Sequence, residues 1–296
     1  MGEIMKKRLI ISVLFALTLS LSLFVFSACH TVYANESVDA TLLFFDDFDT
    51  LDTGVWNIHN EIRKGGYWVD DQAYVKDGNL VLNIEKKDDG NYYMGAIDTK
   101  GKYETHFGYF EARCFLPKAS GIWSAFWIMP QSMEEGRHSS EVNLVGAEID
   151  IMESPYYNPK FPLPKNKETY QCAVHVGDYD RHYRHTQRFI NTTTARRYSK
   201  AKISIYDDWH TYGLHWTDKF YRFYFDRQLV YEITNKKLVS TKQDGYLFLS
   251  IEVGGTNGKA GKPPFIYANS LFKNQEDASP NQFLVDYVAV YDTYPF

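Results

Sequence analysis

Short runs of hydrophobic, β-branched and aromatic residues follow one another along most of the chain, and turn residues separate them about every ten positions. Residues 108–115 alternate cleanly between apolar and polar and stop before Pro117, which cannot donate a hydrogen bond to a neighbouring strand. Helical periodicity of the apolar residues is hard to find. The pattern predicts many short strands, the clearest at residues 42–45, 79–84, 108–115, 123–129, 148–153, 169–176, 209–216, 219–225, 230–233, 246–252 and 283–291.

No linker rich in Gly, Ser or Pro and no internal repeat divides these strands, so residues 35–296 are expected to form a single domain. Strands so numerous with so few helices predict an all-β sandwich or barrel. Loops of great length in a compact domain usually form functional walls or lids. Aromatic-rich strands that end in such loops favour two curved sheets, with a cleft on a concave face; the long loops span residues 131–145, 155–168, 179–202 and 254–282.

One predicted strand carries an unusual row of acids. Glu148 and Asp150 alternate with isoleucines, which is the period-two pattern of a strand with one wet and one buried face. Strict alternation would turn Glu153 inward, but a β-bulge at Ile151–Met152 would return it to the acid face, because two residues then oppose one. Neighbouring carboxylates repel one another and resist desolvation, so the row indicates a functional site more than a solvated edge strand.

Composition narrows the kind of ligand. Aromatic residues make up 17% of the 296 residues, with 23 Tyr and 20 Phe. Exposed aromatic rings suit a protein that stacks against sugar rings or other flat apolar faces. The formal net charge is −5, and no basic stripe accompanies a nucleic-acid-binding motif, so we exclude nucleic acid as a partner and expect a monomer.

Residues 1–34 have the features of an export signal. A basic segment at residues 6–8 precedes an uncharged apolar run at residues 9–26, which approaches the length of a membrane span, so an uncleaved anchor is one alternative. The chain around Ala34 fits signal-peptidase cleavage before residue 35, whereas the residues before Cys29 resemble a lipoprotein box. We expect a secreted, extracellular protein; the alternative is a cell-surface lipoprotein, with a signal ending at residue 28 and a lipid anchor on Cys29.

Cysteine usage agrees with export without proving a disulfide. Beyond Cys29 only Cys114 and Cys172 remain, each in an apolar, strand-like stretch. They could pair, or they could be two buried thiols that pack as small hydrophobes. The nine His are scattered and no two cysteines are closely spaced, so the sequence contains no zinc-type ligand cluster.

Several segments together resemble glycoside hydrolase family 16, the laminarinase-type endoglycanases, over most of residues 41–295. The bulged, six-residue spacing of the acid strand is similar to that of laminarinases, agarases and carrageenases. The resemblance implies a jelly-roll β-sandwich of the concanavalin A-like type, formed by two curved antiparallel sheets. The segments that carry it are residues 48–56, 99–113, 121–130, 148–153, 212–216, 253–255 and 285–291.

The same resemblance implies a retaining endo-β-glycanase that cleaves internal linkages of a polysaccharide by double displacement. Retention requires two carboxyl groups ~5–5.5 Å apart, which a bulged strand permits. By resemblance, Glu148 would be the nucleophile, Glu153 the general acid/base, and Asp150 between them would tune both. Packed like charges push pKa values apart, so that one group is ionised while another is protonated.

Aromatic and histidine residues near the acids are candidates for substrate binding. Trp123 and Trp127 lie four positions apart and share one face of a strand, as a sugar-stacking platform or as a pair of core aromatics. His175 follows the acid strand between two valines. We expect it to hydrogen-bond near the leaving group, although a satisfied core histidine is the alternative. Tyr156 and Tyr157, just after the acid strand, are expected to line the cleft.

Asp286 is a candidate metal ligand. It matches a position that in some family members helps bind a structural calcium ion on the convex face, together with backbone carbonyls. Glycoside cleavage itself requires no cofactor, so such an ion would serve stability.

The identity of the polysaccharide is open. Ala96, Ser124 and Thr256 replace residues that laminarinase-like sequences usually have, in segments that shape sugar subsites. Residues 180–188 are basic and aromatic, and form either a solvated loop or a clamp for sulfated glycans, to which Arg makes bidentate contacts. The expected substrate is β-1,3- or β-1,3-1,4-glucan. The alternatives are a β-galactan or host glycan (agarose, carrageenan, porphyran, keratan or mucin) and a non-catalytic carbohydrate-binding jelly roll.

Overall fold

The computed structural model describes residues 39–118, 121–135, 139–155, 169–191, 204–239, 243–260 and 281–296. The chain from Asp39 to Phe296 forms one compact unit. The expected export signal with Cys29, and the candidates Tyr156 and Tyr157, lie outside the described residues. No helix in the described segments is long and apolar enough to cross a membrane.

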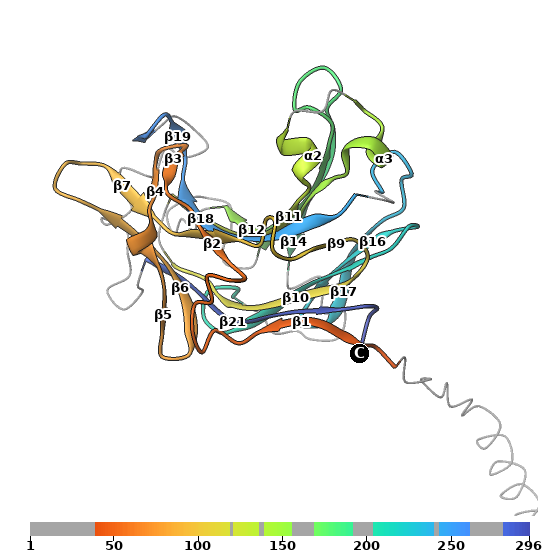
Figure 1. Ribbon diagram of the computed structural model, residues 1–296, viewed down its shortest axis with the longest axis horizontal. Helices are drawn as coiled ribbons and strands as arrows, with labels where there is room; N and C mark the ends of the chain where they lie inside the picture. The colour runs from red at the N-terminus through yellow and green to blue at the C-terminus, as the bar shows by residue number, and fades with distance from the viewer. Residues whose placement is uncertain are drawn as a thin grey trace, which may run out of the picture. The chain divides into compact units, whose positions relative to one another are not determined.

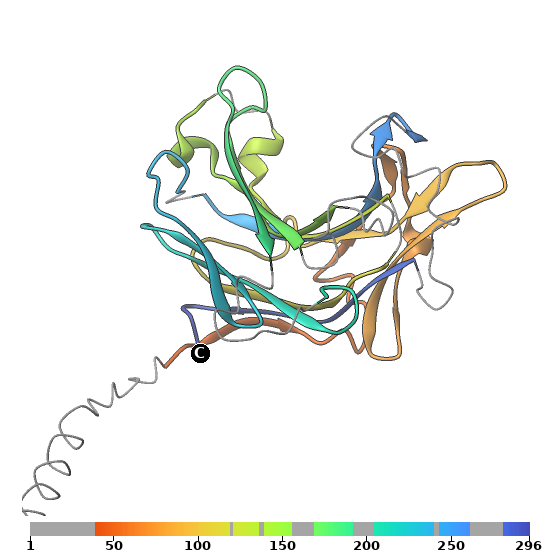
Figure 2. The same ribbon diagram turned by 180° about the vertical axis from the view of Figure 1, so that it is seen from behind.

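Most of the described strands form two large sheets that lie face to face (Figures 1 and 2). The upper sheet in Figure 1 has eight strands, and its described pairings are antiparallel. Seven of them run in the order β14 (Arg184–Asn191), β13 (Thr169–Val176), β12 (Glu148–Pro155), β11 (Ile122–Met129), β18 (Gly245–Val253), β8 (Ala96–Asp98) and β2 (Asn57–Ile58), and β9 (Glu104–Thr105) pairs with β18.

The second sheet has eleven strands and supplies the other half of the sandwich. Its order is β17 (Gln228–Ile233), β16 (Tyr221–Phe225), β15 (His210–Trp216), β10 (Gly108–Phe115), β21 (Gln282–Tyr291), β6 (Asn79–Lys86), β7 (Tyr92–Met94), β4 (Gly66–Trp68) and β3 (Glu61–Arg63), with β1 (Leu42–Asp46) on β21 and β5 (Ala73–Lys76) on β6. Among the described strands, β4 and β7 form the one parallel pair. The predicted all-β sandwich is confirmed.

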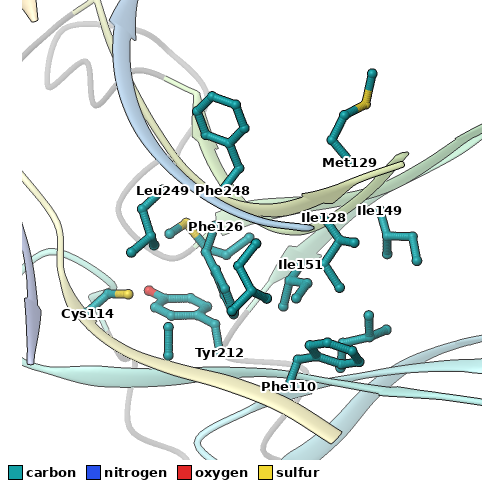
Figure 3. Packing of buried hydrophobic residues seen from close by; sticks show 14 of the residues in the cluster. Phe110, Cys114, Phe126, Ile128, Met129, Ile149, Ile151, Tyr212, Phe248 and Leu249 are labelled. Carbon is teal, nitrogen blue, oxygen red and sulfur yellow. The ribbon is translucent and has the colours of Figure 1, made fainter. Parts of the chain in front are cut away.

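The core fills the space between the two sheets. On the central strand β11, Phe126 and Ile128 are fully buried, and on β12 so is Ile151. Figure 3 shows these side chains on the face of the eight-stranded sheet that points toward Phe110 of β10 and Tyr212 of β15. Because side chains alternate along a strand, the residues between them must point to the opposite face of this sheet.

We call that opposite face the cleft face. Figure 3 shows Phe248 of β18 and Met129 of β11 projecting from it, away from the core. Phe248 is nevertheless buried, because its ring stacks on Trp127 with the ring centroids 4.3 Å apart. Packed aromatic side chains therefore cover this part of the cleft face.

Two groups of elements stand over the cleft face, at opposite ends of its central strands (Figures 1 and 2). At one end, α2 (Gln131–Glu134) and α3 (Val142–Val145) lie in the connection from β11 to β12. At the other end, the turn between β3 and β4 meets the end of β18, where Gly65 N–H donates to the carbonyl of Val253 at 3.2 Å. The cleft face between these two walls therefore extends across the strands, from β2 to β14.

Three details differ from the sequence predictions or decide between them. The predicted loop at residues 179–202 contains an eight-residue strand, β14, at the edge of the eight-stranded sheet, so this prediction is wrong. Cys114 and Cys172 are both buried and free, so they pack as small apolar residues. Asp286 accepts a hydrogen bond from Arg113 Nη1 at 2.6 Å, and its calcium site stays a prediction.

Truncating the central core residue should destabilise the whole sandwich. We expect Phe126→Ala to lower the free energy of unfolding by about 3–5 kcal/mol, because it removes a buried ring from the strand between β12 and β18. Urea unfolding monitored by tryptophan fluorescence measures this loss. Leu43→Ala, at an exposed position on β1, is the control and should change stability by less than about 0.5 kcal/mol. Equal losses in the two variants would contradict this account of the core.

Candidate active site

Strand β12 brings three carboxyl groups to the cleft face. Ile149 and Ile151 are buried in the core, so the alternating residues Glu148 and Asp150 point the other way. Glu153 joins them on the same pocket wall. The sequence prediction that one strand carries these acids on one face agrees with the structure.

The β-bulge predicted at Ile151–Met152 is present. Along β11, Trp127 lies opposite Asp150 and the next residue back, Phe126, lies opposite Met152. Ile151 is thus the extra residue, and it is buried together with Met152. The pairing with β13 shifts over the same stretch. The bulge places two successive apolar residues in the core and shifts Glu153, the acid that follows it, to the face of Glu148 and Asp150.

A pocket lies over the acid row, and both candidate tryptophans line it. Trp123 Nε1 donates to Glu153 Oε1 at 2.9 Å, and Trp127 Nε1 donates to Ser250 Oγ at 3.2 Å. These bonds and the stacking on Phe248 fix the orientation of the two indole rings. The pocket is lined by Arg63, Lys64, Trp123, Ala125, Trp127, Glu148, Asp150, Glu153, Ser250 and Glu252.

Glu153 is held from both neighbouring strands. In addition to the bond from Trp123 of β11, its Oε2 accepts a hydrogen bond from Gln171 Nε2 of β13 at 2.5 Å. Gln171 Oε1 in turn accepts from Gln187 Nε2 of β14. This carboxyl group is therefore oriented by a chain of side chains that extends to the edge of the sheet.

Asp150 and His175 form a pair in the middle of the site. His175 Nε2 lies 3.0 Å from Asp150 Oδ2, and His175 Nδ1 is hydrogen-bonded to the Tyr183 hydroxyl. Burial and the neighbouring acids raise the pKa of Tyr183 to about 12, so its hydroxyl keeps its proton. If that proton is donated to Nδ1, then Nε2 carries the ring proton and donates to Asp150. His175 thus contacts the middle acid, Asp150, and its expected hydrogen bond near the leaving group stays a prediction.

Among the described residues, Glu148, Asp150 and His175 have the spacing of metal ligands. One carboxylate oxygen each of Glu148 and Asp150, and a ring nitrogen of His175, lie within 4.8 Å of one another. Both nitrogens of His175 already contact protein partners, however. Sequence analysis did not identify this group, and in the structure Asp150 and Tyr183 occupy the two ring nitrogens of His175.

Glu148 has a separate partner. The Tyr179 hydroxyl donates a hydrogen bond to Glu148 Oε2 from the turn after β13. This turn is well ordered by its own bonds, because Asp178 Oδ1 accepts from the backbone N–H groups of Asp180 and His182, each at 3.0 Å. Tyr179 itself has a left-handed backbone, with φ 57°, which is unusual for an aromatic residue. Sequence reasoning missed Tyr179, and this turn is what brings it to the acid.

An ion-pair cluster around the buried Glu252 also lines the pocket, and sequence reasoning missed it as well. Glu252 of β18 is buried and accepts from Arg63 Nε at 2.7 Å and from Lys64 Nζ at 2.5 Å. Lys64 has a left-handed φ of 44°, and the next residue must be glycine, because a Cβ on Gly65 would lie 2.2 Å from the carbonyl oxygen of Gly254. The signal in the sequence was a basic pair before two glycines.

Burial dominates the electrostatics of the three acids. It raises the pKa of Glu148, Asp150 and Glu153, and the nearby Asp150 charge raises those of the two glutamates further. Lys64 opposes the rise at Asp150. For Glu252, burial alone would also raise the pKa, but Arg63 and Lys64 outweigh it and lower the value. The cluster therefore favours the ionised form of Glu252 beside three acids whose pKa values are raised.

Two expectations about substrate-shaping residues need correction. Ser124 is buried on the core side of β11, so it shapes packing and not a sugar subsite. In the basic segment, the Arg188 guanidinium lies over the ring of Tyr231, 6.0 Å from its centroid, and Arg184 Nη1 donates to the carbonyl of Ser140 at 3.4 Å. Neither arginine faces the pocket, so these two do not form the suggested anionic-glycan clamp.

The raised pKa values of the acids predict an inverse dependence of stability on pH. A carboxyl group that binds its proton more tightly when folded stabilises the protein below its unfolded pKa, and this stabilisation is lost as pH rises toward the folded pKa. Glu153→Gln removes one such group. Between about pH 5 and about pH 8, we expect the variant to lose about 1–3 kcal/mol less stability than the wild type.

Thermal or urea unfolding at several pH values measures this difference. Glu135→Gln, which changes an exposed carboxylate outside the pocket, is the matched control and should follow the wild type. Parallel loss of stability in wild type and Glu153→Gln would argue against a buried, proton-binding Glu153.

The amino-acid sequence matches a known protein family. A sequence model described as the GH16 domain of β-porphyranases A–D matches residues 43–293. A β-glucanase of Rhodothermus marinus is 30% identical over 235 residues, which cover 75% of this chain and 70% of the relative. A β-1,3-glucan-binding protein of Penaeus monodon is 25% identical over 87% of this chain and 86% of its own length.

A solved structure shares the fold. The family 16 enzyme of a Bacteroides ovatus mixed-linkage glucan locus, in complex with its product, superposes with a TM-score of 0.65. It is 23% identical, and the match covers 84% of this chain and 99% of the other. The expected jelly-roll architecture is confirmed by this likeness.

Proposed function

The chain belongs to glycoside hydrolase family 16, and we propose that it is a retaining endo-β-glycanase in which Glu148 attacks the sugar and Glu153 supplies the proton. The observation that carries this proposal is the bulged strand β12, which holds both glutamates on one pocket wall with Asp150 between them. A double displacement requires two carboxyl groups that flank the scissile bond about 5–5.5 Å apart, and the bulge offsets Glu153 from Glu148 along one strand.

In the first step, a Glu148 oxygen forms a bond to the anomeric carbon while the bond from that carbon to the leaving oxygen breaks. Glu153 gives its proton to the leaving oxygen. Burial and the Asp150 charge favour the protonated form of Glu153, and the bonds from Trp123 and Gln171 hold its carboxyl group in place. The hydrogen bond from Tyr179 favours the ionised form of Glu148.

In the second step, a water molecule displaces Glu148 from the anomeric carbon. Glu153, now ionised, accepts a proton from the water as its oxygen attacks, and the bond to Glu148 breaks. His175 Nε2 stays beside Asp150 in both steps and holds this acid between the two glutamates, whose charges change. Glu148 and Glu153 end the cycle in their starting protonation states.

For the substrate we propose β-1,3- or β-1,3-1,4-glucan. The support is the Rhodothermus marinus relative, whose name gives it as a β-glucanase, together with the shared fold of the mixed-linkage glucan enzyme. A β-galactan of the porphyran type is a second candidate, because the matching family model is described as that of β-porphyranases. The export signal expected at residues 1–34 supports action outside the cytoplasm, as a secreted protein or as a lipoprotein anchored through Cys29.

Substitutions of Glu148 and Glu153 should have different effects on the kinetics. We expect Glu148→Gln to lower kcat by at least about 10³-fold on any accepted polysaccharide, because no carboxylate can then attack. Glu153→Ala should also be slow on polysaccharide, but on an aryl oligoside, whose leaving group needs no protonation, added azide should restore turnover and yield a β-glycosyl azide. Product analysis by NMR measures both effects. Glu135→Gln is the control and should keep wild-type rates, and absence of azide rescue would remove the support for Glu153 as acid/base.

A panel of polysaccharides separates the candidate substrates. We expect purified enzyme to release oligosaccharides of several lengths from laminarin or mixed-linkage glucan, since an open cleft admits internal linkages. Porphyran, agarose, carrageenan and mucin glycans are included in parallel, with product sizes read by chromatography. Cleavage of porphyran alone would reject the glucan proposal and favour the galactan. Inactivity on the whole panel would favour a carbohydrate-binding protein without catalysis.

A further inference from the structure

The edge strand β14 carries an exposed aromatic ring on the cleft face. Gln171 of β13 lies opposite Phe189 of β14, and His175 lies opposite His185. His185 stacks on the rings of His175 and Tyr183, and therefore belongs to the cleft face. Because side chains alternate, Phe189 shares that face, and its side chain is 60% exposed.

The neighbours of Phe189 along the strand confirm this orientation. Ile190 is buried, and the Arg188 guanidinium lies over Tyr231 of β17 in the other sheet. Gln187, two residues from Phe189, donates to Gln171 and so points to the cleft face. Phe189 is thus outside the core between the sheets, although a ring of this size is usually buried.

Phe189 lies in one row with the acid/base. Glu153, Gln171 and Phe189 occupy matching positions on three neighbouring strands, and Gln171 bridges to Glu153 through a hydrogen bond. Neighbouring strands are ~4.8 Å apart, so Phe189 lies about 10 Å from the acid strand, across the sheet. A disaccharide spans such a distance.

The two walls of the cleft face set the direction in which a polymer can lie. The helices α2 and α3 stand at one end of the central strands, and the turn between β3 and β4 at the other (Figures 1 and 2). An extended chain between them must cross the strands. From the acid row, one arm then enters the pocket over β11 and β18, and the other passes over β13 to Phe189.

We propose that Phe189 is a stacking platform for a sugar ring in the leaving-group arm of the polysaccharide. The inference rests on the proposed function. The pocket, with its Arg63–Lys64–Glu252 cluster and fixed tryptophans, suits the sugar that becomes covalently attached and must be held through both steps. The leaving arm must depart after the first step, and a single exposed ring at the sheet edge suits such a transient contact.

The test compares substrates with and without sugars in the leaving-group arm. Phe189→Ala should lower kcat/KM on laminarin or porphyran, whichever is cleaved, by about tenfold. On the matching 4-nitrophenyl oligoside, whose leaving group is an aryl ring directly at the cleaved bond, kcat/KM should stay within about twofold of wild type. Phe189→Trp should retain most of the activity on the polysaccharide. Leu229→Ala, another exposed apolar position outside the pocket, is the control and should leave both substrates unaffected.

A binding measurement separates this proposal from the proposed function. In affinity electrophoresis through gels that contain laminarin or porphyran, Phe189→Ala should migrate faster than wild type, and this readout needs no turnover. Faster migration without any cleavage by the wild type would support the sugar contact and reject the enzyme. Equal loss of kcat/KM on polysaccharide and aryl substrate, or equal migration of the variant and wild type in both gels, would overturn the role of Phe189.

Discussion

The burial of three carboxyl groups side by side on β12 is the constraint on which the rest of the site depends. Each group lost its water shell on folding, and together they repel one another, so each needs a specific partner. Tyr179 meets Glu148, His175 meets Asp150, and Glu153 is held by donors from both neighbouring strands. These partners come from two separate parts of the sequence, β11 and the stretch from Gln171 to Tyr179, which strand pairing brings to the two sides of β12.

The balance of charge in the pocket fits the proposed chemistry. Arg63 and Lys64 bring two positive charges, and the buried Glu252 neutralises one of them. The remaining positive charge opposes the upward pKa shifts in the acid row, because Arg63 lowers the pKa of Glu148 and Lys64 lowers those of Asp150 and Glu153. A row with one ionised and one protonated glutamate is the state from which a double displacement starts.

The sequence identified the parts of the site that depend on local pattern. Alternation along residues 148–153 predicted the acid face and the bulge, and spacing placed Trp123 and Trp127 on one face. The Arg63–Glu252 pair spans 189 positions, and no local pattern reports a contact of that range. The sequence of β14 does not show the pattern of a strand, because most residues on both of its faces are polar, as an edge strand beside a wet cleft allows.

The bulge shows how core packing and chemistry constrain each other at a single position. Ile151 and Met152 are both buried, so the core accepts two consecutive side chains from β12 where regular pleating would accept one. Phe126 packs at the same level of β11, opposite Met152. A residue lost from this stretch would restore regular pleating and turn Glu153 away from Trp123 and Gln171. The offset that the reaction requires is therefore set by apolar residues that never touch the sugar.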